Sequence, residues 1–281
     1  MRGTIGLLLA VMVMAIPTAS AEETYVIVNR GQADPPIVQA TGDALQRCIP
    51  FYAHALNMTP EKIDVYLAPS RQAFAQALQT RGSYPAAAAA GWANTAHVVP
   101  SNSNASLLFV SEEAMRDLTT QQVVESICIG IGTILERQLG GARRVSGHHW
   151  LRQGYSAFMA ASALDAFKLR SLAATRDNVS RALAQIRREN RPFPTLAATR
   201  TLDGWQKVFQ DYGATEAEAF VFAAVDLLTS KSGPQAFGPY FKGLGYRDRL
   251  PNIDDLFQTA FTLSLDQFQA ELDTYLAAQA K

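Results

Sequence analysis

One apolar segment carries a carboxylate that could do chemistry. Residues 123–128 read Val-Val-Glu-Ser-Ile-Cys, and Glu125 is the only charged residue among them. A glutamate in such a setting either accepts structural hydrogen bonds or acts as a general base. Val124 and Cys128 are four residues apart, so on a helix both side chains share one face. Zinc peptidases place two histidines at this spacing, but valine cannot coordinate a metal and a single cysteine cannot hold zinc.

A second motif follows at residues 150–157, which read Trp-Leu-Arg-Gln-Gly-Tyr-Ser-Ala. Taken with residues 123–128, it resembles the peptidase-MA-like gluzincin metallopeptidases. These have a strand-helix-strand-helix opening, an edge strand, an HExxH helix and a helix that begins W-L-x-E-G. The resemblance covers nearly the whole mature chain, because C-terminal fragments match in kind as well, at residues 193–196, 219–221, 232–234 and 263–268.

The resemblance assigns a role to each position of the former zinc site. The first histidine falls on Val124, the general base on Glu125, the second histidine on Cys128 and the third ligand on Gln153. Three ligands are therefore lost and the base is kept, so we expect no zinc, no cofactor and no peptidase activity. A register shifted by one residue, with Glu125 and Ile129 at the histidine positions, also leaves no zinc site. An ordinary apolar helix with a structural glutamate remains the alternative.

The same resemblance predicts where a ligand would bind. Gly91, Trp92, Ala93 and Asn94 would form the edge strand of the substrate cleft, which pairs with an extended polypeptide. We therefore expect a non-catalytic peptidase-like protein that binds a polypeptide partner in that cleft. Two alternatives remain open: a hydrolase that uses Glu125 by an unrecognised mechanism, and a structural or assembly protein with an empty cleft.

Histidines and cysteines give weaker signals. None of the four histidines has ligand spacing, and the adjacent His148 and His149 are predicted to lie in a solvated loop or helix cap. Cys48 and Cys128 allow one intramolecular disulfide if the protein is exported. They are either bonded or free, and a free Cys128 would fill the space of the lost histidine as a small apolar residue.

The N-terminus predicts export. Arg2, an apolar run at residues 5–16 and the sequence Ala-Ser-Ala at residues 19–21 predict a signal peptide cleaved after Ala21. The run is too short to span a bilayer, so we expect a periplasmic or secreted protein without a membrane span. Cleavage removes only Arg2 among the charged residues, which leaves 24 basic and 25 acidic groups. This balance argues against nucleic acid as a partner.

Periodicity predicts strands and helices in alternation in the N-terminal half. β-branched and aromatic residues predict four strands, at residues 24–29, 63–67, 97–99 and 107–110. Apolar spacing predicts a helix at residues 37–56, kinked or divided at Pro50, and a second helix capped by Ser70. Residues 81–91, with five consecutive alanines, are predicted to be a connection.

Only helices are predicted after Thr119. The first is capped by Thr120, runs to about Leu139 and is stopped by Gly140 and Gly141. The others are predicted at residues 150–164, 165–189 (one or two helices), 216–229, 234–244, 253–261 and 265–278. The expected fold class is α+β. Residues 1–21 are the signal peptide, 22–141 a zincin-like lobe with a mixed sheet and the degenerate HExxH helix, and 142–281 an all-helical lobe.

Overall fold

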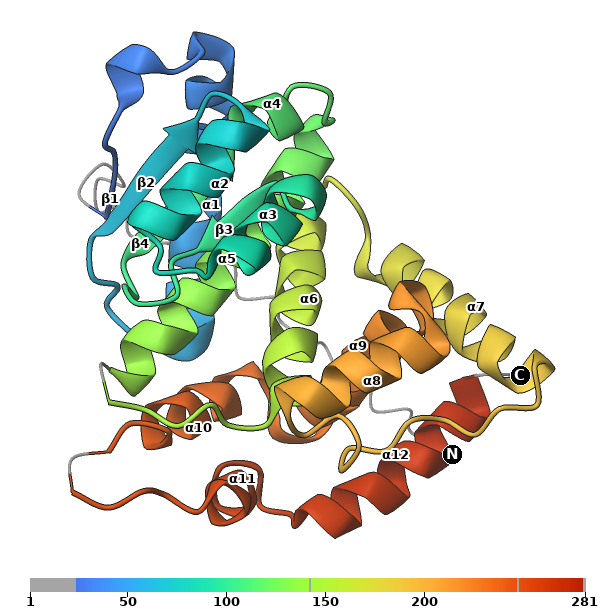
Figure 1. Cartoon of the computed structure of the whole chain (residues 1–281). Helices are drawn as coiled ribbons and strands as arrows, with labels where there is room; N and C mark the ends of the chain where they lie inside the picture. The colour runs from blue at the N-terminus through green and yellow to red at the C-terminus, as the bar shows by residue number, and fades with distance from the viewer. Residues whose placement is uncertain (1–23, 142, 247, 280–281) are drawn as a thin grey trace, which may run out of the picture.

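The computed structural model describes residues 24–141, 143–246 and 248–279, and its fold is α+β. A small sheet lies in the N-terminal half, and helices make up the rest (Figure 1). The predicted signal peptide and its cleavage site after Ala21 lie outside the described residues. Within the described ranges, none of the helices combines the length and the hydropathy that crossing a bilayer requires.

Four strands form a mixed sheet in the order β1-β2-β4-β3. β1 (Tyr25–Ile27), β2 (Ile63–Ala68) and β4 (Leu107–Ser111) are parallel to one another. β3 (Val98–Pro100) pairs antiparallel with β4 and forms one edge of the sheet. All four strands were predicted at these places, because β-branched and aromatic residues pack well on a pleated surface.

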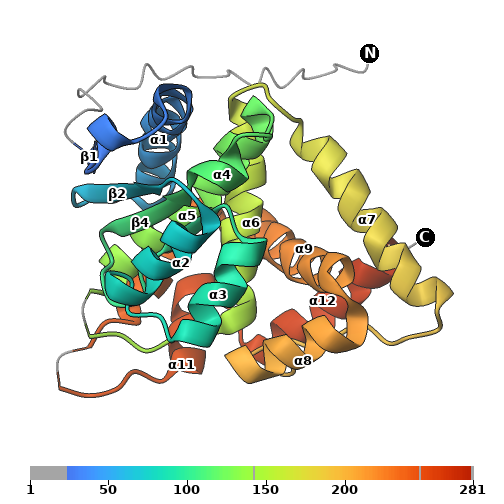
Figure 2. The same ribbon diagram turned by 45° about the horizontal axis from the view of Figure 1, so that its top comes forward.

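Helices cover both faces of the sheet (Figure 2). On one face, α2 (Arg71–Thr80) and α3 (Ala86–Thr95) enclose a small apolar cluster with Val99 and Phe109. On the other face, α1 (Pro35–Leu56) and α5 (Thr120–Gly140) pack against each other and begin the main core. Two short elements connect these helices to the strands, η2 (Arg30–Gln32) and α4 (Glu112–Met115).

The helical half shares its core with the sheet half. One apolar cluster runs from α1 and α5 through α6 (His149–Ala166) to the last helix. The remaining elements of this half are α7 (Leu172–Arg188), α8 (Leu202–Tyr212), α9 (Ala214–Ser232), η3 (Pro234–Ala236), α10 (Phe237–Gly243), α11 (Ile253–Phe261) and α12 (Leu265–Gln279). α6 packs on α9 so closely that a side chain at Gly154 would meet the Val221 carbonyl oxygen at 2.2 Å. This contact explains the glycine of the Trp-Leu-x-x-Gly motif.

Local chemistry explains where the helices begin. Ser70 caps α2 as predicted, since its Oγ accepts from the N–H of Ala73. The cap of α5 is Thr119, one residue before the predicted Thr120, because Thr119 and Gln122 form a capping box. Of the two expected effects of Pro50, a kink or a division, the division is wrong, because α1 continues through this residue. Burial of one face of α1 against α5 outweighs the hydrogen bond that this proline removes.

Residues 86–95 correct two predictions. They form α3, whereas the alanine run was expected to be a connection and Gly91 to Asn94 an edge strand. Alanine has the highest helix propensity of all residues, and Ala89 and Ala93 lie one turn apart and bury one face of α3. The edge strand is instead β3, a few residues further along the chain.

Candidate functional site

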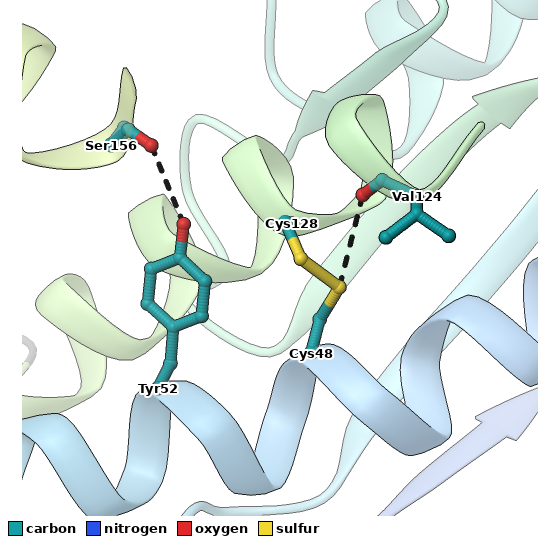
Figure 3. The surroundings of a disulfide bond; sticks show 5 residues. All are labelled: Cys48, Tyr52, Val124, Cys128 and Ser156. Carbon is teal, nitrogen blue, oxygen red and sulfur yellow. Dashed lines mark hydrogen bonds between the residues drawn. A yellow bond between two sulfur atoms is a disulfide. The ribbon is translucent and has the colours of Figure 1, made fainter. Parts of the chain in front are cut away.

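A disulfide fixes the segment that carries Glu125. Cys128 on α5 is bonded to Cys48 on α1, and both residues are fully buried (Figure 3). Sγ of Cys48 also lies 3.8 Å from the carbonyl oxygen of Val124, whose side chain is buried in the main core. Of the two alternatives left open by the sequence, bonded or free, the structure has the bonded one. The face of α5 that carries Val124 and Cys128 is therefore turned toward α1.

The carboxylate of Glu125 is held by Arg170, which lies between α6 and α7. Nη2 of Arg170 donates to Oε1 of Glu125 at 2.5 Å, and Nη1 donates to Oε2 at 3.3 Å. The side chains are 29% exposed for Glu125 and 24% for Arg170. Paired hydrogen bonds of this kind are strong and fix the orientation of both groups. Glu125 is thus half-buried and electrostatically paired.

The ion pair forms part of the wall of a cavity of about 260 Å³ between α5, α6, α7 and α9. We call this the Glu125 cavity. Its other walls are mainly apolar and include Ile129, Ala157, Ala161 and Phe222. Ile129 is 41% exposed, which is unusual for a large aliphatic side chain. The cavity therefore combines one fixed charge pair with an accessible apolar surface.

Gln153, the expected third ligand position, is exposed on α6 and is not among the residues of the cavity wall. Gln153 lies beside the later part of α5, because its neighbour Arg152 pairs with Glu136 of that helix. The Tyr52 hydroxyl, which donates to the Ser156 carbonyl on α6, belongs to a ring that packs against Gly132 on α5. That part of α5 is about two turns beyond Cys128. The structure does not bring Val124, Cys128 and Gln153 to one point.

The helix face that contacts the cavity belongs to the shifted register. Glu125 and Ile129, one turn apart, both line it, whereas Val124 and Cys128 pack against α1. Across the described residues, no three His, Cys, Asp or Glu side chains are grouped so that they could hold a metal ion. The polar groups of the cavity wall are the Arg170 guanidinium, which donates, the Glu125 carboxylate, which accepts, and the side chains of Thr175, Asn178, Thr215 and Glu218, which suits binding of polar groups.

The predicted edge-strand residues lie on α3. Trp92 is 46% exposed, and the carbonyl oxygens of Ala93 and Asn94 accept hydrogen bonds from Nη1 of Arg71, at 2.6 and 3.1 Å. α3 leads directly into His97, whose Nδ1 lies 3.3 Å from Oγ of Ser126. The segment that follows α3 therefore contacts α5 next to Glu125.

The edge of β3 offers little room for strand addition. Ser111 donates to the His97 carbonyl and Ser101 to the Leu107 carbonyl, so the backbone groups of Val98 and Pro100 point away from β4. Pro100 has no N–H, and its carbonyl accepts from the hydroxyl of Tyr84 at 2.8 Å. A proline at this place is a common way to protect a sheet edge from pairing.

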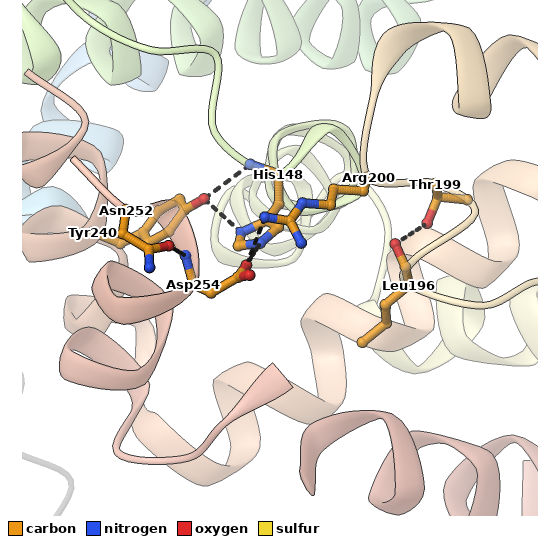
Figure 4. Close-up of polar contacts among 7 residues, drawn as sticks. All are labelled: His148, Leu196, Thr199, Arg200, Tyr240, Asn252 and Asp254. Atoms are coloured by element: carbon orange, nitrogen blue, oxygen red, sulfur yellow. Dashed lines mark hydrogen bonds and ion pairs between the residues drawn. The ribbon is translucent and has the colours of Figure 1, made fainter. Parts of the chain in front are cut away.

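A buried polar network was missed by the sequence analysis. His148 was expected in solvent, but it is fully buried, with Nδ1 2.8 Å from the hydroxyl of Tyr240 and Nε2 2.9 Å from Asp254 (Figure 4). Arg200 also pairs with Asp254, at 3.0 Å. Burial lowers the pKa of His148 and raises that of Tyr240. The network joins the start of α6 to α10 and α11; His148 and Tyr240 are fully buried, whereas Arg200 and Asp254 are 37% and 43% exposed.

The functional partner that the sequence did not reveal is Arg170. It lies 45 residues from Glu125, in a connection between two helices, and no motif marks it. The only available signal was chemical: a carboxylate on an apolar helix requires a donor from elsewhere. Neither a protein-family model nor a curated protein matches this chain.

Proposed function

We propose that this chain is an exported, non-catalytic relative of the gluzincin peptidases that binds a polypeptide at the Glu125 cavity. The observation that carries the proposal is the pairing of Glu125 with Arg170. A general base must be free to accept a proton from water. Both carboxylate oxygens of Glu125 instead accept hydrogen bonds from a guanidinium, so neither is free to accept that proton.

The order of elements supports the relationship. An antiparallel edge strand, β3, lies next to α5, and a side chain at Gly130 would meet Val98 at 2.8 Å. α6 follows with the Trp-Leu-x-x-Gly motif and packs on α5. This arrangement is the one expected from the resemblance, with the edge strand beside the helix that would hold the metal.

The accessible apolar surface supports binding. Ile129, Ala157 and Phe222 form an apolar wall, and Glu125 and Arg170 supply an acceptor and a donor beside it. Such a combination fits one apolar side chain of a peptide together with its polar backbone. Because Pro100 and Tyr84 restrict strand addition at β3, we expect side-chain contacts in the cavity to contribute more than a long backbone ladder.

The proposal is tested by selecting peptides from a random displayed library on the purified mature protein and measuring their affinities by fluorescence anisotropy. Ile129→Asp introduces a charge into the cavity wall, and we expect it to weaken the selected peptides by about tenfold or more. Val28→Asp is a matched control, because Val28 is an aliphatic residue of similar exposure, 46% against 41%, near β1.

Two results would contradict the proposal. One is a library that yields no peptide above the background of an unrelated protein. The other is an equal effect of Ile129→Asp and Val28→Asp, which would place binding outside the cavity. Export is tested separately by the mass of the protein recovered from the medium or periplasm, which should begin at Glu22.

A further inference from the structure

A second, larger cavity of about 880 Å³ lies at the other end of α5. It is bounded by the turn between β3 and β4, by the last turn of α5 and by the segment that leads into α6. Figure 1 shows these parts side by side at the lower left, and hydrogen bonds of Gln138 to Glu61 and Ser106 confirm that they are in contact. We call it the arginine cavity, because Arg137, Arg144 and Arg152 line it.

The positive charge of this cavity is only partly compensated. Arg152 pairs with Glu136, which is 3% exposed, and Glu61 lies exposed at the rim. Within the part of the chain that the structure describes, Arg137 and Arg144 have no carboxylate within salt-bridge distance. Two of the three guanidinium groups therefore lack an anionic partner.

The guanidinium groups also retain hydrogen-bonding capacity. One N–H of Arg137 donates to the carbonyl of Ser101, and Nη1 of Arg144 donates to the carbonyl of Gly141 at 3.1 Å. Nε of Arg137 is buried and has no partner. Because a guanidinium has five N–H donors, most of those on Arg144 remain available.

The three cations act on one another. Burial lowers the pKa of Arg137, and the charge of Arg152 lowers it further. Burial likewise lowers the pKa of Arg144, with added effects from the charges of Arg137 and Arg152. The charge of Glu136 acts in the opposite sense and raises the pKa of both Arg137 and Arg144, so it offsets part of this repulsion, and a bound anion would offset more.

Capping of α5 does not account for the cluster. A cation near a helix C-terminus is favourable, which explains Arg137 alone. The last carbonyl groups of α5 already accept from the N–H of Gly141, at Arg137 and Gln138. Arg144 and Arg152 lie beyond that helix, so the concentration of positive charge has another origin.

We propose that the arginine cavity binds an oxyanion, a phosphate or carboxylate group, through Arg137 and Arg144. Guanidinium groups bind both classes through paired hydrogen bonds. Asn102, Asn104 and Ser146 add amide and hydroxyl groups to the wall, and the volume admits a ligand larger than the anion itself. This site is separate from the Glu125 cavity, and the two can be tested independently.

Isothermal titration calorimetry of the full mature protein tests the site with two probes, pyrophosphate for the phosphate class and citrate for the carboxylate class. We expect at least one of them to bind with an affinity that falls as salt is raised. Arg144→Gln should weaken it by about tenfold, because it removes charged donors. Asn102→Asp, which changes an exposed side chain of nearly the same shape, should do the same by adding a negative charge.

The matched control is Arg187→Gln. Arg187 also donates to a backbone carbonyl, that of Ala277, but it lies on α7 away from the cavity. Its replacement should leave the affinity unchanged. The proposal is overturned if neither probe binds, or if Arg187→Gln weakens binding as much as Arg144→Gln does. It is also overturned if Arg144→Gln and Asn102→Asp both leave binding unchanged while the variants remain folded.

Discussion

The two ends of α5 differ in how far their charged side chains are paired with opposite charges. Near its beginning, Glu125 is paired with one guanidinium, in a mainly apolar wall that also contains Glu218. Near its end, three guanidinium groups line one polar wall, and the buried carboxylate of Glu136 forms a salt bridge with Arg152 alone. A matched pair stabilises the folded state but leaves little charge for chemistry, whereas an unmatched cluster costs stability and attracts a ligand.

The difference shows why a retained catalytic residue type is weak evidence of catalysis. Glu125 has the residue type of a general base, but its environment makes it a structural partner of Arg170. No sequence motif marks the arginines. Nε of Arg137 is nevertheless buried without a hydrogen-bond partner, and burial together with the charges of Arg137 and Arg152 lowers the pKa of Arg144. The first region is also tied to α1 by the disulfide, and the second has no such covalent restraint in the described residues.

Removal of the disulfide should have the largest effect. The double variant Cys48→Ala and Cys128→Ala is expected to lose about 2–4 kcal/mol of unfolding free energy, because the bond closes a long loop in the unfolded chain. The residues are 80 apart in sequence. Chemical denaturation measures the loss, and the reduced wild-type protein is the control, since it should match the variant closely. A stability equal to that of the oxidised wild type would show that α1 and α5 need no covalent link.

Replacement of the partner of Glu125 should have an intermediate effect. Arg170→Met leaves a half-buried carboxylate without its two hydrogen bonds, and we expect a loss of about 1–2 kcal/mol, less than for a fully buried pair. Arg144→Met makes the matched comparison at the other end of α5. It leaves no carboxylate unpaired and removes repulsion, so its loss should be smaller, under about 1 kcal/mol. Equal losses in urea unfolding would remove the distinction between the two regions.

The smallest expected effect is a pH dependence near the start of α6. Burial, with the charge of Arg152, lowers the pKa of His149 from 6.5 to about 4, and its Nε2 is buried without a partner. As the pH falls from about 6.5, the unfolded chain takes up this proton first, so stability falls until about pH 4. His149→Phe retains a ring beside Trp205 and should reduce that fall by about 1–2 kcal/mol, allowing for partial exposure.

This last prediction is measured from urea midpoints at pH 7 and pH 4 for the wild type and the variant. Other acid-sensitive groups, such as Asp254, titrate equally in both proteins. The difference between the two proteins in how far stability falls from pH 7 to pH 4 therefore reports on His149. Parallel curves would mean that the ring is already accessible to protons in the folded state.

The sequence by itself determined most of the local structure. Strands β2 and β4 follow from β-branched and aromatic residues, and the start of α2 follows from Ser70, because these preferences act within a few residues. The α+β class was predictable for the same reason. Alanine propensity also favours a helix at residues 86–95, but only the tertiary structure decided which face of α3 is buried and that β3 is the edge, since the alanine run carries no apolar period.

The candidate sites depend on contacts over long sequence separations. The sequence identified Glu125 and the possible pairing of Cys48 with Cys128, but it could not orient α5, and so it could not tell which of two registers contacts the cavity. Arg170 reaches Glu125 over 45 residues, and Arg137 meets Arg144 and Arg152 only because a turn brings α6 back along α5. Local propensities contain no information on such approaches. They are fixed by the packing of the helices into one core, which selects the neighbours of each charged group.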